Sequence, residues 1–356
     1  MSAGSDNPAT ARRIFSGIQP TGRKHLGNYI GAIRQYVIGQ DEIDAGAGEE
    51  AIYCIVDLHA ITVAYDPEEL RERVYDTTAT LLAAGLDPER CVLFRQGDVR
   101  EHTELSWLLG GVTAWGDLNR MHQWKTKREQ AESQAGEFVS AGLFNYPILM
   151  AADVLAYRAT EVPVGDDQRQ HVELMREIAR RFNERFGPTL AVPEHRIPGV
   201  GARIMDLQDP TSKMSTTSGG EAGRIYVLDE PERIRKKFRS AVTDSGREVR
   251  RAGPDEPGGK AGIENLIEIL CVVRGVSPEV IEAEFEGSGY GDFKGAVGDA
   301  IAEYLAPVRE RYTTLREDPA ELERVLAAGA GKARAIAAPV LADVRDAMGV
   351  AAPRGQ

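Results

Sequence analysis

The chain has 356 residues, of which 42% are hydrophobic and 28% are charged, and its formal net charge is −12. This length favours two domains, and the composition is that of a globular protein with a sizeable core. No uninterrupted apolar run approaches the roughly 20 residues that cross a bilayer. The three cysteines, Cys54, Cys91 and Cys271, lie far apart and form no Cys-x-x-Cys pair. This excludes the spacing of a zinc site and predicts buried thiols in a reducing cytoplasm.

The first part of the chain alternates between strand-like and helix-like segments. Residues 1–11 are small and polar, which predicts a disordered tail, and residues 13–18 are typical of a short buried strand. Gly22 then breaks the chain, and a helix is expected from about His25. The continuous apolar run at residues 51–56 is typical of a parallel strand that is covered on both faces.

The alternation continues to residue 208. Asp66 and Pro67 mark the start of a helix that is expected to end before Gly85. A further strand is expected at residues 91–94, and residues 167–186 have the pattern of a long amphipathic helix. This order predicts an α/β fold built on a Rossmann-like, open parallel sheet.

The pattern changes near residue 210. Residues 209–223 are rich in Thr, Ser and Gly, which predicts a mobile loop. Residues 224–350 have mostly helical patterns. We therefore expect a sheet domain over residues 12–208 and a mostly helical C-terminal domain over residues 224–350, whose last helix packs back on the sheet domain.

Two turns, each leading from a strand into a helix, carry polar side chains. In residues 19–28 the free N–H groups of a helix start favour anionic oxygen, with His25 and Asn28 on one face of the first turn. Gly27 allows a flat ring to approach the backbone. In residues 165–168 an Asp can hydrogen-bond ribose hydroxyls. Taken alone, the first turn also fits a capped helix with an exposed His, and the second fits ordinary N-capping.

Two further features suggest chemistry. Lys213 lies in a loop rich in hydroxyl groups and glycine, which can fold over a polyphosphate. Asp153 interrupts the strongly apolar run 146–155, and a buried acid needs partners. It either makes a structural hydrogen bond or recognises a donor such as an indole N–H, which has no acceptor capacity. Alone, the loop also fits a solvated surface segment.

The order and spacing of these features resemble the class I aminoacyl-tRNA synthetases. His25-Leu26-Gly27-Asn28 is similar to their His-x-Gly-His motif, with Asn in the last place. Lys213-Met214-Ser215-Thr216-Thr217 matches part of their Lys-Met-Ser-Lys-Ser loop. The resemblance is to the bacterial tryptophanyl members and covers about residues 12–348. It also includes residues 15–22, 55–62, 150–153, 162–168, 200–205, 240–245 and 287–291.

The resemblance implies a two-step reaction. The carboxylate of L-tryptophan attacks the α-phosphorus of ATP, which gives tryptophanyl-adenylate and pyrophosphate, and tryptophan is then transferred to the 3′-terminal ribose of tRNA(Trp). Mg2+ is implied as an ion bound through the ATP phosphates, with no metal held by the protein itself. The resemblance further implies a cytoplasmic homodimer, with catalysis in residues 12–208, a KMSKS-type loop at 209–223 and anticodon binding in 224–350.

Site residues follow from the same resemblance. The catalytic residues it implies are Gln19, His25, Asn28 and Lys213. The ATP-binding residues it implies are Gln19, His25, Gly27, Asn28, Gly165, Asp167, Ile204, Lys213 and Met214. The tryptophan pocket it implies consists of Phe15, His59, Tyr146, Met150, Asp153, Val162, Val164 and Gln168, with Asp153 accepting from the indole N–H.

The loop departs from the family pattern at Thr216, where a second lysine is usual. A lost charge at a transition-state contact costs about 3 kcal/mol or more. We expect Lys213, Mg2+ and either Lys125 or Lys127 to share the stabilisation of the leaving pyrophosphate.

Two alternatives stay open. A tyrosyl-tRNA synthetase is one, because tyrosine also offers a donor, although the context at residues 150–153 argues against it. The other is a non-catalytic paralogue that binds tryptophan or tRNA without making adenylate, and the retained Lys213 argues against that. A tRNA partner needs a local basic face despite the acidic total. Candidate basic groups are Arg176, Arg180, Arg181, Arg235, Lys236, Lys237 and Arg239.

Overall fold

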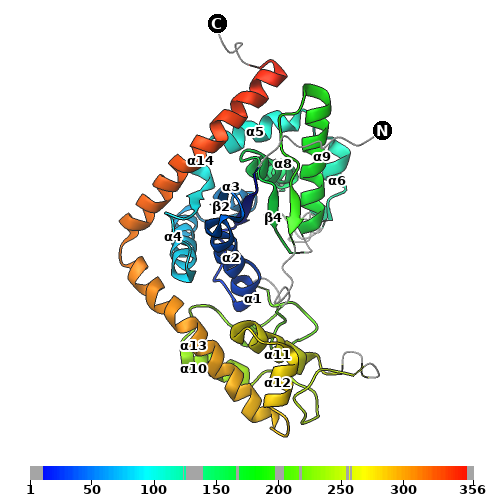
Figure 1. The fold of residues 1–356 in the computed structure, drawn as a ribbon, viewed down its shortest axis with the longest axis vertical. Helices are drawn as coiled ribbons and strands as arrows, with labels where there is room; N and C mark the ends of the chain where they lie inside the picture. Colours follow the sequence, from blue (N-terminus) through cyan, green and yellow to red (C-terminus); the bar gives the residue numbers. More distant parts are fainter. Residues whose placement is uncertain are drawn as a thin grey trace.

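The computed structural model describes residues 11–122, 124–125, 139–165, 168–196, 204–215, 219–253, 256 and 259–350. The chain forms two lobes (Figure 1). The sheet lobe contains the β-sheet and the helices around it, and the helical lobe contains α10, α11 and α12. Helices α13 and α14 follow one another along one side of both lobes.

The sheet has five strands in the order β3-β2-β1-β4-β5, and all neighbours are parallel. The chain builds outward from β1 to β3 and then returns to place β4 on the other side of β1. In open α/β sheets, ligands bind beyond the carboxyl ends of the strands at such a switch point. The predicted fold class is confirmed. The strands are β1 (Arg13–Ile18), β2 (Glu50–Ile55), β3 (Val92–Arg95), β4 (Glu161–Pro163) and β5 (Glu194–Arg196).

Helices cover both faces of the sheet, because alternate side chains of β2 enter two separate cores. Tyr53 and Ile55 pack in one core, and Ile52 and Cys54 pack in the other. The sheet-lobe helices are α1 (Leu26–Asn28), α2 (Arg34–Glu42), α3 (Asp57–Ala60), α4 (Pro67–Ala84), α5 (Glu101–Gly110), α6 (Trp115–Asn119), α8 (Ala141–Leu155) and α9 (Arg169–Phe186). The described residues also include π-helical turns at Tyr29–Ile33 and Ile43–Ala47 and 3-10 turns at Gln96–Asp98 and Glu221–Gly223.

Helix α4 shows why local sequence specifies its ends. The Asp66 side chain accepts from the backbone N–H groups of Glu68 and Glu69, which satisfies donors that the helix leaves free. Gly85 ends the helix with φ 118°, a left-handed conformation that favours glycine. The predicted start and end of this helix are therefore confirmed.

The remaining helices are α10 (Pro231–Arg239), α11 (Ala261–Arg274), α12 (Pro278–Glu284), α13 (Tyr290–Arg316) and α14 (Pro319–Met348). Helix α14 returns to the sheet lobe, where Ala330, Ala333 and Ala337 are buried. A Cβ added at Gly329 would lie 1.8 Å from the carbonyl oxygen of Leu93, so the helix approaches β3 closely. Among the described residues, α14 is also the helix whose length and hydropathy alone would permit a membrane span. Its packing against β3 and α5 accounts for its apolar side.

Candidate active site

A cavity of about 440 Å³ opens at the switch point of the sheet. Residues within and just after β1 and β4 line it, together with residues of α2, α3 and α8. All eight residues expected in the tryptophan pocket meet here, namely Phe15, His59, Tyr146, Met150, Asp153, Val162, Val164 and Gln168. Gln19 and Gly165, expected in the ATP site, line the same cavity. A mostly apolar cavity with a few convergent polar groups is the usual form of a small-molecule site.

Helix α8 supplies one wall of the cavity. Tyr146, Met150 and Asp153 are spaced by four and three residues, which places them on one face of a helix. The Tyr146 hydroxyl lies 2.8 Å from Nε2 of His171 on α9, so a neighbouring helix holds this side chain. The local pattern of α8 therefore brings an aromatic ring, a thioether and a carboxylate to one cavity.

Asp153 is the buried acid of the cavity, with 2% exposure. Its Oδ2 lies 2.8 Å from His59 Nε2, and its Oδ1 lies 2.6 Å from His102 Nδ1. Oδ1 also accepts a hydrogen bond from Gln96 Nε2 at 2.6 Å. Burial alone would raise the pKa of Asp153, but the hydrogen bond from His102 and the charge and hydrogen bond of His59 lower it below its usual range. Asp153 is therefore an ionised acceptor.

Gln96 and His102 were missed by the sequence reasoning. Both follow β3, and both are fully buried. Because parallel strands place their carboxyl ends at one edge of the sheet, polar residues just after β3 were candidates for the same site as those after β1 and β4. That rule could have found them.

The second part of the site is the start of α1. The His25 backbone N–H donates to Asn28 Oδ1, and the Asn28 backbone N–H donates to His25 Nδ1, both at 3.2 Å. These two bonds cap the helix, as the alternative reading of this turn has it, but His25 is only 4% exposed, so the exposed His of that alternative is wrong. Gly27 is tightly enclosed, because a Cβ there would lie 3.0 Å from His25 Nδ1 and 3.7 Å from Ile204 Cβ.

The segment that follows the lysine loop pairs with this helix start. His25 and Tyr226 form an antiparallel bridge, and the Leu26 N–H donates to the Ile225 carbonyl at 2.7 Å. This pairing holds Arg224 near the turn. Burial first, and then the positive charges of Lys213, Arg224 and Lys24, lower the pKa of His25 to about 4. Arg224 is a further residue that the sequence reasoning missed.

His25 is expected to stay neutral across the physiological range. Its ring titration, followed by NMR, should have a midpoint near pH 4 rather than the ordinary 6.5. The unfolded chain then binds more protons between pH 6.5 and pH 4, so the free energy of unfolding should fall as the pH falls through that window. His25→Asn keeps an N-capping group and removes the titration, so this variant should lose less stability over the window. A wild-type midpoint near 6.5 would contradict the expectation.

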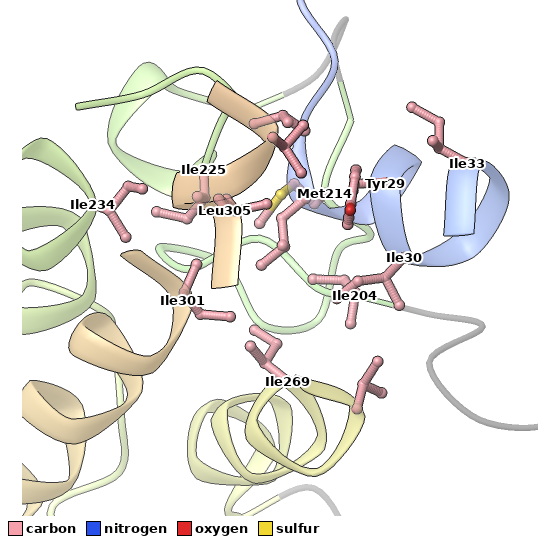
Figure 2. Close-up of a cluster of buried hydrophobic side chains, with 14 of the residues drawn as sticks. Tyr29, Ile30, Ile33, Ile204, Met214, Ile225, Ile234, Ile269, Ile301 and Leu305 are labelled. Atoms are coloured by element: carbon pink, nitrogen blue, oxygen red, sulfur yellow. The ribbon is translucent and has the colours of Figure 1, made fainter. Parts of the chain in front are cut away.

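The lysine loop is anchored at its base. Met205 and Lys213 form a bridge, and the Met214 N–H donates to the Ile204 carbonyl at 2.9 Å. Ile204 and Met214 are each 1% exposed and lie in a cluster of buried side chains that includes Tyr29 (Figure 2). The side chain of Lys213 is exposed, so the loop presents its charge while its base belongs to the core.

Gly223 closes the same loop against a buried carboxylate. Asp206 Oδ1 accepts from the backbone N–H groups of Gln208 and Asp209, and a Cβ at Gly223 would lie 1.9 Å from that oxygen. Gly223→Ala is therefore expected to lower the free energy of unfolding by about 1–3 kcal/mol, as measured in urea. The control is Gly220→Ala, which meets no atom within 4 Å. Equal stability of the two variants would contradict this reading of the contact.

Three predicted residues, Asp167, Lys127 and Thr216, lie outside the described part of the chain. Lys125 is described, and it is exposed. Among the described residues, no three His, Cys, Asp or Glu side chains are grouped so as to hold a metal ion.

The basic clusters expected to face tRNA are largely paired. Lys237 is a correction, because it is buried and donates to Asp229 Oδ2 at 2.7 Å and to the Arg224 carbonyl at 2.6 Å. Arg235 pairs with Glu232 and Asp299. In the other cluster, Arg181 pairs with Asp117 and Glu177, and Arg176 donates to the Pro193 carbonyl. The exposed basic side chains that remain in these clusters are Arg180, Lys236 and Arg239.

The sheet is parallel in this strand order, and a glycine-bearing helix start and a lysine loop lie beside its switch point. This combination is typical of one class of nucleotide-binding enzymes. The chain belongs to the class I tRNA synthetases (W and Y), whose family model matches residues 7–306.

Within that family, the chain is similar to several tryptophan enzymes over nearly its whole length. The tryptophan–tRNA ligase of Wolinella succinogenes is 47% identical over 339 residues, covering 95% of this chain and 99% of that protein. The crystal structure of tryptophanyl-tRNA synthetase from Mycoplasma pneumoniae has a TM-score of 0.85 at 34% identity, covering 96% and 99% of the two chains. The tryptophanyl-tRNA synthetase of Campylobacter jejuni, complexed with ADP and tryptophan, has a TM-score of 0.77 at 32% identity, covering 95% and 99%.

Proposed function

We propose that this protein activates L-tryptophan with ATP and transfers it to tRNA(Trp). The observation that carries the proposal is the cavity at the switch point, where an ionised and buried Asp153 meets apolar walls within a chain of this family. The near full-length similarity to tryptophan–tRNA ligases supports the same substrate.

Asp153 explains the choice of amino acid. A carboxylate accepts hydrogen bonds only, and the indole N–H of tryptophan is a donor only. Phenylalanine would leave the carboxylate with an unfilled position, which disfavours it strongly. Val162, Val164 and Phe15 line the cavity and would pack on the indole ring. Gln168 and Tyr146 would hold the amino group.

ATP would lie between the helix start and the lysine loop. Gln19 would adjoin the reacting carboxylate and the α-phosphate, and Gly165 and Asp167 would bind the ribose. His25, Gly27 and Asn28 would hold the phosphates and adenine. Ile204 and Met214 would contact adenine, which requires the loop base to move, since both side chains are covered in this structure.

Catalysis would consist of positioning and of neutralising phosphate charge. Lys213 is the loop group proposed to contact the pyrophosphate, and Arg224 and Lys24 add positive charge around His25. Mg2+ would arrive with the triphosphate and supply charge neutralisation there. No side chain needs to form a covalent bond with the substrate.

The second step and the assembly follow the same proposal. Residues 12–208 would form the catalytic domain, 209–223 the KMSKS-type loop and 224–350 the anticodon-binding domain. A homodimer across the sheet lobes is supported by the exposed side chains of Trp107 and Trp115, which are 84% and 68% accessible. A cytoplasmic location is supported by the three cysteines, which are free and buried.

The test is ATP–pyrophosphate exchange with purified protein and Mg2+, comparing tryptophan, tyrosine and phenylalanine. Exchange with tryptophan alone is the expected result. Exchange with tyrosine would favour the tyrosyl alternative and overturn the reading of the cavity. Tryptophan binding without any exchange would favour the non-catalytic paralogue.

A further inference from the structure

Two buried side chains hold Asp153 without taking part in the cavity wall. Gln96 and His102 are each fully buried, and neither lines the cavity. Gln96 Nε2 and His102 Nδ1 both lie 2.6 Å from the same carboxylate oxygen, Oδ1 of Asp153. The other oxygen, Oδ2, meets only His59, which does line the cavity.

The orientation of each holding group is set by a further hydrogen bond. Gln96 Oε1 accepts from the Leu58 backbone N–H at 3.1 Å, so its amide nitrogen points to Asp153. His102 Nε2 lies 2.6 Å from the Tyr157 hydroxyl. Since an ionised carboxylate can only accept, Nδ1 of His102 donates to it, and the bond between Nε2 and Tyr157 holds the other side of the ring. Burial raises the pKa of Tyr157 well above its usual value, so the hydroxyl keeps its proton.

The two bonds on Oδ1 have a geometric consequence for Oδ2. Each carboxylate oxygen has about two acceptor positions. Oδ1 is filled by Gln96 and His102, which fixes the rotation of the carboxylate plane. Oδ2 bonds to His59, which lines the cavity, and keeps one acceptor position.

We propose that His102 and Gln96 are positioning residues that determine specificity, because they hold Oδ1 of Asp153 and thereby aim Oδ2 at the ring N–H of the amino acid substrate. This inference rests on the proposed function. It differs from a purely structural role in one measurable respect. A structural defect lowers the affinity for every amino acid, whereas a rotated carboxylate penalises only a substrate that carries the N–H group.

The probes are L-tryptophan and β-(3-benzothienyl)-L-alanine, in which sulfur replaces the ring N–H while the shape is nearly kept. For each substrate, calorimetry with the full chain gives Kd. ATP–pyrophosphate exchange with the same protein gives kcat/KM. The preference for tryptophan is the ratio of kcat/KM, or of 1/Kd, for tryptophan to the same quantity for the analogue. This ratio reports the strength of the N–H contact. Wild type should prefer tryptophan strongly.

His102→Leu and Gln96→Leu should lower that ratio by tenfold or more, through loss of tryptophan binding and not of analogue binding. His102→Asn can still donate to Oδ1 and should restore most of the ratio. Tyr157→Phe keeps the ring volume and should lower the ratio less, so it tests the idea even where a leucine variant does not fold. The matched control is Tyr75→Phe, whose hydroxyl bonds Glu323 on α14 instead.

Equal losses for both substrates in the variants, with the ratio unchanged, would overturn the positioning role. The proposed function fails separately, if wild type shows no exchange with tryptophan. In that case the Kd ratio still decides the inference, since it needs no catalysis. A wild-type protein that binds both substrates equally would overturn the inference as well.

Discussion

Replacing Asp153 with asparagine is expected to lower kcat/KM for tryptophan by about 1000-fold, because sites built to hydrogen-bond a substrate lose binding steeply when that pairing fails. Three donors converge on this carboxylate, from His59, His102 and Gln96. Asparagine replaces one acceptor oxygen with an NH2 group, so at least one donor would then face another donor. A buried donor without an acceptor costs about 1–3 kcal/mol.

The measurement is ATP–pyrophosphate exchange with tryptophan and with β-(3-benzothienyl)-L-alanine. The rate with the analogue, which has no ring N–H to bond Asp153, should change little. The control variant is Asp98→Asn, which removes a half-buried carboxylate paired with Arg95 on the turn that also carries Gln96. That control should stay within about twofold of wild type. A tryptophan rate for Asp153→Asn that matches the control would show that Asp153 does not read the indole.

Local signals were sufficient to predict the frame of the sheet lobe. The capping Asp66 and the terminating Gly85 act within their own helix, and the apolar run of β2 reflects burial on both faces. These features depend on residues close together in the chain, so they can be predicted from a single sequence.

The polar side of the site depends on contacts between distant residues. Gln96 and His102 are 57 and 51 positions from Asp153 in the sequence, and no periodicity joins them. Lys237 was expected on a basic surface because α10 is rich in positive charge. Its partner Asp229 precedes the helix and is buried with it, which charge counting along a helix does not reveal. The resemblance located the pocket residues, but the hydrogen bonds behind Asp153 came from the structure.

The second large effect is expected from Lys213→Ala, which should lower the rate of ATP–pyrophosphate exchange by about 100-fold while the affinity for tryptophan stays unchanged. Removing one preorganised group from a developing charge costs about this much. The side chain of Lys213 is exposed, and the loop base is held by the backbone bridge between Met205 and Lys213, so the variant should fold normally. The control is Lys236→Ala, an exposed lysine on α10.

The size of the loss in exchange rate tests which groups replace the second loop lysine, whose place Thr216 takes in this chain. Arg224 and Lys24 remain near His25 in the Lys213→Ala variant, and a substitute charge there would leave measurable exchange. If Arg224 shares the work, Arg224→Gln should also lower the rate, by about tenfold, with ATP affinity falling more than AMP affinity. If Lys125 shares it as well, as we expect of Lys125 or Lys127 from the sequence, Lys125→Ala should lower the rate too. An unchanged rate in Lys213→Ala would remove the loop lysine from the reaction and leave phosphate neutralisation to groups outside the loop.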